Sequence, residues 1–136
     1  MLPSRAMDAQ QALADLAEIS SQIEAAVLFG PRGGVTASTL AETERARELA
    51  HRAAELLDAA EAVGAGTDEP LTQLEVATHE GSVFVVRDGD RRIAATTAPD
   101  PTVGLVFYDL KSCLRSLDAD EKPKRSRKKK DASDAS

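Results

Sequence analysis

The longest amphipathic pattern in the chain runs from Leu40 to Val63 without a proline or glycine. Its apolar residues recur every three or four positions, which places their side chains on one face of an α-helix. Thr39 followed by Glu42 fits a capping box at its start, and Gly64 and Gly66 fit its stop. A helix of this length spans about 36 Å, whereas a five-stranded sheet is only about 24 Å wide, so we expect alanine-rich surface beyond the sheet. The residues of this stripe are Ala46, Leu49, Ala50, Ala53, Leu56, Leu57, Ala60 and Val63.

A helix and a β-hairpin are predicted before this segment. Asp8 is placed to cap a first helix, in which apolar residues keep helical spacing as far as Ile23. Two short apolar runs follow, over residues 25–29 and 35–38. The glycine-rich loop between them, residues 30–34, is typical of a turn between paired strands.

Three strands are predicted after the long helix. Residues 74–79 alternate between apolar and polar, as in a strand that is buried on one face near a sheet edge. Residues 83–86 are apolar throughout, which favours a strand covered on both faces. Asp88 and Gly89 predict a tight hairpin whose two central residues both have positive φ, and residues 93–97 return as the fifth strand.

A last helix is predicted from Asp100, with aspartate as its cap and Pro101 at the first helical position. Leu105 and Tyr108 lie outside its apolar stripe, so we expect them to meet another helix or a partner. From residue 118 onward apolar residues vanish, which is typical of a disordered tail. The stripe itself consists of Val103, Val106, Phe107, Leu110, Leu114 and Leu117.

The predicted element order is therefore α-β-β-α-β-β-β-α. Short hairpins join the consecutive strands, so the sheet should be antiparallel, and helices on both faces make an α+β fold, a three-layer α/β/α sandwich. We divide the chain into an N-terminal extension (residues 1–7), one domain (residues 8–117) and a basic tail (residues 118–136).

Charge is strongly segregated along the chain. Residues 1–121 carry 10 Lys and Arg against 21 Asp and Glu, whereas residues 122–136 carry 7 against 2. The acidic body and an aromatic content of 3% argue against nucleic acid binding by the domain. The tail could instead contact an anionic surface through Lys122, Lys124, Arg125, Arg127, Lys128, Lys129 and Lys130.

Composition points to a cytoplasmic protein. The single cysteine allows no disulfide within the chain, and no apolar run approaches the roughly 20 residues that span a bilayer. The expected location is the cytoplasm, with a peripheral position at the inner membrane face if the tail binds lipid.

The candidate chemical groups favour structural roles over catalysis. The glycine-rich loop lacks the GxxxxGK[ST] spacing of a phosphate-binding loop, and no HExxH or CxxC motif joins the two histidines, His51 and His79. No base is placed to activate Cys113, and no GxSxG motif occurs. We therefore expect no enzyme activity, no cofactor and no metal. Turn arginines that could act as an arginine finger, although solvated arginines are the simpler reading, are Arg32, Arg91 and Arg92.

Two stretches resemble the roadblock family of dynein light chains and bacterial GTPase regulators. They are EAAVLFGPRGGVTAST, residues 24–39, and VFVVRDGDRRIAATTAPDPTVGLVFYDL, residues 83–110. With the helix spacing, the resemblance covers roughly residues 8–117. It implies that the long helix covers one face of the sheet and the terminal helices the other. It also implies a homodimer, formed by the third strand and the long helix, that binds a small Ras-like GTPase or acts as a scaffold.

The resemblance also assigns candidate residues. The long-helix positions expected to contact a GTPase are Arg45, Glu48, Arg52 and Glu55. A plain alternative is a solvated surface on which Glu48 and Arg52 form an i,i+4 pair. The expected dimer contacts are Leu74, Val76 and Thr78 in the third strand, with Ala53 and Leu57 in the helix.

Two other function classes remain open. In the first, the basic tail carries the function and tethers an adaptor to a membrane or polyanion, while the domain only dimerises. In the second, the domain is a small-ligand sensor, although no convergent polar cluster in the sequence supports a ligand pocket.

Overall fold

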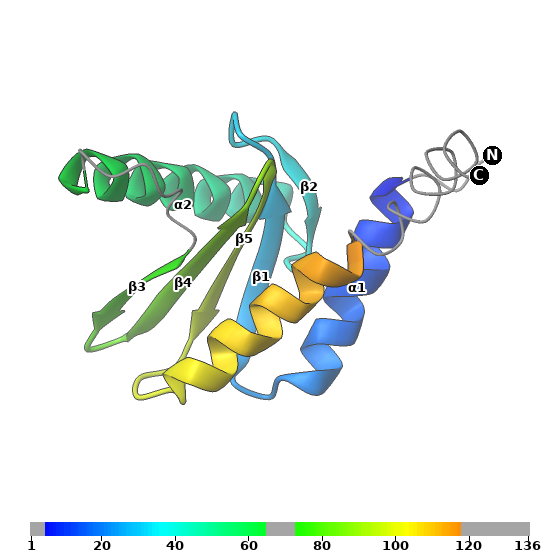
Figure 1. Cartoon of the computed structure of the whole chain (residues 1–136). Helices are drawn as coiled ribbons and strands as arrows, with labels where there is room; N and C mark the ends of the chain where they lie inside the picture. The colour runs from blue at the N-terminus through cyan, green and yellow to red at the C-terminus, as the bar shows by residue number, and fades with distance from the viewer. Residues whose placement is uncertain (1–4, 65–72, 118–136) are drawn as a thin grey trace, which may run out of the picture.

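The computed structural model of the protein describes residues 5–64 and 73–117, and it confirms the predicted element order (Figure 1). These described residues form a five-stranded sheet with three helices. We call the helix over residues 103–117 the last helix. The other elements are α1 (Arg5–Ile19), β1 (Ile23–Phe29), β2 (Val35–Ser38), α2 (Thr43–Val63), β3 (Gln73–Thr78), β4 (Gly81–Asp88) and β5 (Arg91–Thr97).

The sheet has the strand order β2-β1-β5-β4-β3, and all neighbouring strands are antiparallel, as predicted. Two sequential units, β1–β2 and β3–β4–β5, join where β1 pairs with β5, for example at Val27 opposite Ala94. This order puts β5 in the centre and leaves β2 and β3 at the edges. Within the described residues, β3 therefore pairs only with β4.

Helices cover both faces of the sheet, which confirms the three layers (Figure 1). On one face, α1 and the last helix enclose the larger core, where the rings of Phe84 and Phe107 meet edge-on with centroids 5.0 Å apart. On the other face, α2 packs on Val27, Val85 and Ala94. Residues 84–86 are buried on both faces, as the apolar run in β4 predicted.

The first helix differs from the prediction at both ends. It begins at Arg5, so Asp8 lies in its first turn and is not the N-cap. It ends at Ile19, because the Ser20 N–H closes the helix on the Leu16 carbonyl at 2.8 Å and the chain then turns into β1. Ile23 is already the first strand residue and pairs with Thr97.

The predicted capping box of the long helix is also wrong. The Thr39 hydroxyl accepts a hydrogen bond from the Ala26 N–H at 2.9 Å, and the Thr39 N–H donates to the Ala26 carbonyl at 2.9 Å. Thr39 thus extends the pairing with β1 beyond the end of β2. α2 starts at Thr43, and Glu42 at its N-cap makes no side-chain cap bond. The stop predicted at Gly64 is confirmed, since the Gly64 N–H donates to the Ala60 carbonyl at 3.0 Å, and Gly66 lies outside the described residues.

Two turns differ from their predicted geometry. The β4–β5 hairpin pairs Asp88 with Arg91, so Gly89 and Asp90 are its central residues, and only Gly89 has positive φ. Asp100 does not cap the last helix, because its own φ is 61° and the chain is not yet helical there.

The last helix starts two residues later than predicted. The Val106 N–H bonds the Thr102 carbonyl at 3.0 Å, which makes Thr102 the N-cap position. Gln22 fixes this start, because its Oε1 accepts the Thr102 N–H at 2.7 Å. Val103 is therefore at the exposed first turn, outside the buried stripe, and Cys113 joins that stripe instead.

Candidate functional site

α2 approaches the sheet closely because its buried residues are mostly small. Three alanines and one leucine form this contact, so little side-chain volume separates the helix from the strands. Arg87 of β4 adds an ion pair to Glu61 near the end of the helix. These contacts leave the opposite side of α2 free to face a partner. The buried residues are Ala46, Ala50, Ala53 and Leu57.

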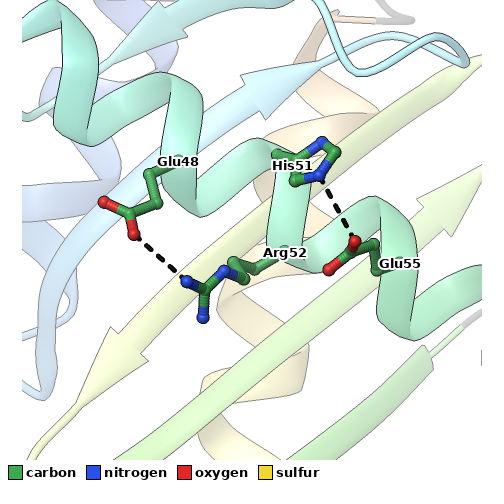
Figure 2. Close-up of polar contacts among 4 residues, drawn as sticks. All are labelled: Glu48, His51, Arg52 and Glu55. Atoms are coloured by element: carbon green, nitrogen blue, oxygen red, sulfur yellow. Dashed lines mark hydrogen bonds and ion pairs between the residues drawn. The ribbon is translucent and has the colours of Figure 1, made fainter.

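The outer side of α2 carries polar and charged side chains that contact one another along the helix (Figure 2). Arg52 Nη2 lies 3.3 Å from Glu48 Oε2, and His51 Nε2 lies 3.3 Å from Glu55 Oε2. Arg45 Nε similarly lies 3.4 Å from Glu42 Oε1 at the start of the helix. All these side chains are more than 60% exposed, so each of the two arginine–glutamate pairs is worth only about 0.3–0.5 kcal/mol.

The four predicted GTPase contacts therefore all lie on this exposed side. We call Arg45, Glu48, Arg52 and Glu55 the α2 surface. The structure also shows the plain alternative, since Glu48 and Arg52 do form an i,i+4 pair. A solvated surface and a contact surface are compatible here, because a weak exposed pair can exchange its partners at little cost in free energy.

An apolar rim lies beside the buried core of α2. Leu49 and Leu56 on the helix and Leu74 and Val83 on the sheet are half-buried around it. Val76 pairs with Val83 in the ladder and is 37% exposed, so it extends this rim along the edge strand. We call these five residues the β3 rim. Thr78, at the end of the strand, is exposed.

Two of the predicted dimer contacts are placed elsewhere. Ala53 is 0% exposed and Leu57 is 3% exposed, because both face the sheet of their own chain. They support the helix from beneath and are not available on the surface of one chain. Leu49 and Leu56, one helical turn away on the same apolar stripe, are the accessible positions. The sequence pattern places both leucines in the stripe but does not separate the edge of the stripe from its centre.

The groups weighed for other chemistry have structural surroundings. Cys113 is buried, which raises the pKa of its thiol to about 11 with a further contribution from Asp15, and its Sγ donates to the Ala12 carbonyl at 3.7 Å. His51 and His79 are both exposed and lie on different elements. The described residues contain no group of three side chains suited to hold a metal ion.

The glycine-rich loop uses its backbone groups internally. The Gly30 N–H donates to the Gly34 carbonyl at 3.0 Å, and the Gly33 N–H donates to the Gly30 carbonyl at 2.9 Å. Gly33 has a φ of 84°, which glycine adopts without strain. The loop is therefore a hairpin turn with Arg32 exposed at its tip.

The cavity nearest to the remaining turn arginines is small. It measures about 180 Å³ and is lined in part by Asp90, Arg91 and Arg92. Ligand sites for drug-sized molecules usually have volumes of about 300–1,000 Å³. Arg92 Nη1 donates to the Asp90 carbonyl at 3.0 Å, so one of the two arginines is held within its own turn.

Two observations bear on the predicted contact with a membrane. The seven cations of the tail, residues 122–130, lie outside the part of the chain that the structure describes. Among the described helices, none combines the length and the apolar character needed to cross a bilayer.

Comparison with known proteins identifies a matching family and several similar structures. Residues 9–98 match the family model of the Roadblock/LC7 domain. A Roadblock/LC7 domain structure from Streptomyces avermitilis superposes with a TM-score of 0.73 at 16% identity, covering 81% of this chain and 94% of that chain. A search of curated protein sequences gives no match.

Structures of MglB are similar as well. One with a tetrameric arrangement has a TM-score of 0.73 at 15% identity, covering 86% of this chain and 90% of that chain. MglB from Myxococcus xanthus has a TM-score of 0.69 at 15% identity, covering 93% of this chain and 94% of that chain. At these identities the structural matches establish the fold.

Proposed function

This chain belongs to the Roadblock/LC7 domain family, and we propose that it is a non-enzymatic regulator or scaffold that binds a small Ras-like GTPase as a homodimer. The observation that carries this proposal is the exposed α2 surface, whose charges are paired only weakly and along the helix. It lies on the side of the sheet away from α1 and the last helix, so both terminal helices leave it uncovered (Figure 1).

The proposed dimer joins two copies at β3. As an edge strand with β4 as its described partner, β3 offers backbone groups to a second strand. Antiparallel pairing of β3 with its copy continues the sheet across a two-fold axis, and that axis is perpendicular to the sheet. The same operation brings the β3 rims together, so that Leu49, Leu56 and Val76 lose water from their apolar surface.

The register identifies which residues of β3 face outward. Thr78 and Gly81 close a two-residue hairpin, and such a pair exchanges its hydrogen bonds. Pairs alternate along the ladder, so Val76 also faces β4, whereas the backbone groups of Glu75 and Ala77 point to the free edge.

Ala77→Pro therefore tests the dimer directly. Proline removes an outward N–H while leaving the bonds to β4, so light scattering should show a dimer for the wild type and a monomer for the variant. Ala77→Ser keeps the N–H and should remain a dimer. A monomeric wild type would exclude the proposed assembly.

The GTPase is proposed to contact the α2 surface. Breaking an exposed pair such as Glu48–Arg52 costs only a few tenths of a kcal/mol, and each charge can then pair with a partner residue. Any stimulation of hydrolysis would arise by ordering the switch loops of the GTPase, through tighter binding to their ordered state. Arg32→Ala and Arg91→Ala should then each retain most of the stimulation.

Stimulated hydrolysis separates this mechanism from an arginine finger. A finger contributes about 10³-fold or more to the rate, whereas loop ordering needs no arginine from the regulator. Loss of stimulation in either alanine variant, with binding retained, would favour the finger. Single-turnover GTP hydrolysis by the purified GTPase, with and without each variant, provides the measurement.

A second candidate function is favoured by the charge segregation of the chain. The tail has seven cations within nine residues, attached to a body with an excess of eleven acidic groups over basic ones. In this version the tail tethers a dimeric adaptor to an anionic membrane or polyanion. Removing residues 118–136 should leave the melting temperature unchanged and weaken binding to anionic vesicles at low salt. Equal vesicle binding by both proteins would exclude the tether.

A further inference from the structure

The last helix carries large apolar side chains that are not buried in the larger core. Its inner side is filled by Val106, Phe107, Leu110 and Leu114, all buried in the larger core. On its outer side, Leu105 is 50% exposed and Tyr108 is 62% exposed. Two large apolar side chains within four residues of one helix form an exposed surface that the fold alone does not explain.

Two cations continue the same outer side of the helix. Lys111 lies three residues after Tyr108 and Arg115 four residues after Lys111, so the three side chains lie in one row along the helix, with Lys111 half-buried and Arg115 exposed. Neither cation makes an ion pair or a hydrogen bond with any residue in the described part of the chain. The cations Arg45 and Arg52 of α2, by contrast, are both paired. We call Leu105, Tyr108, Lys111 and Arg115 the outer strip.

We propose that the outer strip docks on the surface of an anionic phospholipid bilayer. Leu105 and Tyr108 would enter the headgroup region, where the apolar ring and the polar hydroxyl of tyrosine both find a suitable environment. Lys111 and Arg115 would contact lipid phosphates. Interfacial helices combine apolar and cationic side chains in this way.

Charge complementarity selects a lipid surface as the occupant. Residues 1–121 carry a large acidic excess, which an anionic membrane repels, so the domain can approach only through a cationic side. The outer strip provides one, whereas α1 beside it carries Asp15 and Glu18 on its exposed surface. The seven tail cations follow within 13 residues of the described end of this helix at residue 117.

The strip is compatible with the proposed GTPase contact. α2 and the last helix lie on opposite faces of the sheet, so a protein held by the outer strip presents its α2 surface away from the membrane (Figure 1). If the proposed dimer forms, its axis is perpendicular to the sheet and puts both strips on one side. Two contacts on one surface increase the apparent affinity through effective concentration.

Tyr108 supplies a direct measurement at the proposed contact. It is the only tyrosine, and the chain contains no tryptophan, so tyrosine emission of the full chain reports on this one position. Vesicles of phosphatidylcholine with phosphatidylglycerol should reduce quenching of this emission by acrylamide, and pure phosphatidylcholine vesicles should not. Vesicle binding with unchanged quenching would overturn the proposal, even if the tail binds.

Charge variants separate the strip from the tail. Lys111→Gln and Arg115→Gln should each weaken vesicle binding about fivefold at low salt, since one cation near such a surface contributes about 1 kcal/mol. Arg47→Gln makes the same charge change on exposed α2, on the opposite face, and should have little effect. If removing residues 118–136 abolished binding while both strip variants bound like wild type, the tail tether would stand and the outer strip would be excluded.

A soluble polyanion identifies the ligand class. Heparin offers anionic groups without an apolar region, so it should compete for the tail and leave the acrylamide quenching of Tyr108 unchanged. Equal protection of Tyr108 by heparin and by anionic vesicles would contradict a bilayer contact. Leu105→Ala should weaken vesicle binding severalfold, because this contact depends on apolar burial. Val63→Ala, at an exposed position on α2, is the matched control.

Discussion

The two faces of the sheet are built in different ways, and the difference separates the part of the molecule that stabilises the fold from the part that we propose binds a partner. The face under α1 and the last helix contains large, fully buried side chains such as Phe84, Leu13 and Leu110. The face under α2 is closed mainly by alanines, with half-buried leucines at its margin. A deep core of large residues tolerates little change. A thin core under an exposed charged helix leaves more of its surface open to contact.

Matched leucine substitutions should show this contrast most strongly. Leu110→Ala removes a fully buried side chain from the larger core and should lower the free energy of unfolding by about 2–5 kcal/mol. Leu56→Ala, at a half-buried position on α2, should cost about 1 kcal/mol or less in a monomeric background such as Ala77→Pro. Urea titration measures both values. Equal losses would mean that the two faces contribute alike to stability.

The turn that holds the edge strand should be nearly as sensitive. Gly81 has a φ of 152°, and a Cβ at this position would lie 2.2 Å from the Thr97 carbonyl oxygen. Gly81→Ala should therefore cost about 1–3 kcal/mol or more, because alanine rarely adopts this φ and because the backbones of β4 and β5 must also separate. Gly89 has a φ of 65° but open space around it, so Gly89→Ala should lower the free energy of unfolding by less than Gly81→Ala. Thermal unfolding of the two variants then measures the additional cost of the steric clash at Gly81, since a strained backbone is common to both positions.

The larger core should also make the free energy of unfolding depend on pH in the alkaline range. Burial raises the pKa of Cys113 to about 11, above the value of 9.0 for a free thiol, so the folded state keeps its proton longer than the unfolded state. Stability is therefore unaffected below pH 9 and falls as the pH rises from 9 to 11, by up to about 2 kcal/mol. Cys113→Ala should lack this part of the decrease. Urea titrations of both proteins at pH 8 and pH 10.5 test the difference.

The charged surface of α2 should show the smallest effect on stability. Glu48→Ala removes one exposed pair and should change the free energy of unfolding by about 0.5 kcal/mol or less. A loss of 2 kcal/mol would show that this face supports the fold, contrary to the division between the two faces.

Much of this arrangement could be predicted from local patterns. Periodicity gave the order of elements, and the all-apolar run in β4 correctly predicted burial on both faces. Helix starts were predicted less well, because they depend on contacts distant in sequence. Thr39 bonds to Ala26 and so does not cap α2, and Gln22 bonds to Thr102 at the start of the last helix, so neither helix start could be recognised from the neighbouring residues alone.

The candidate site shows the same limit. The charged positions of α2 were correctly expected on the exposed side, because helical periodicity puts them opposite the apolar stripe that packs on the sheet. Ala53 and Leu57 were assigned to a dimer although the same stripe had to cover the sheet. A stripe has a buried centre and an accessible edge, and only the packing shows that Leu49 and Leu56 form that edge.

Binding of a purified Ras-like GTPase to a charge-swapped α2 tests the central claim most directly. The double variant Glu48→Arg with Arg52→Glu keeps the pair within the helix but reverses the charges that a partner meets. We predict an unchanged dimer and melting temperature, with affinity for the GTPase lowered at least tenfold in calorimetric titration, a loss of about 1.4 kcal/mol. Wild-type affinity in this variant would contradict the assignment of the α2 surface as the docking face.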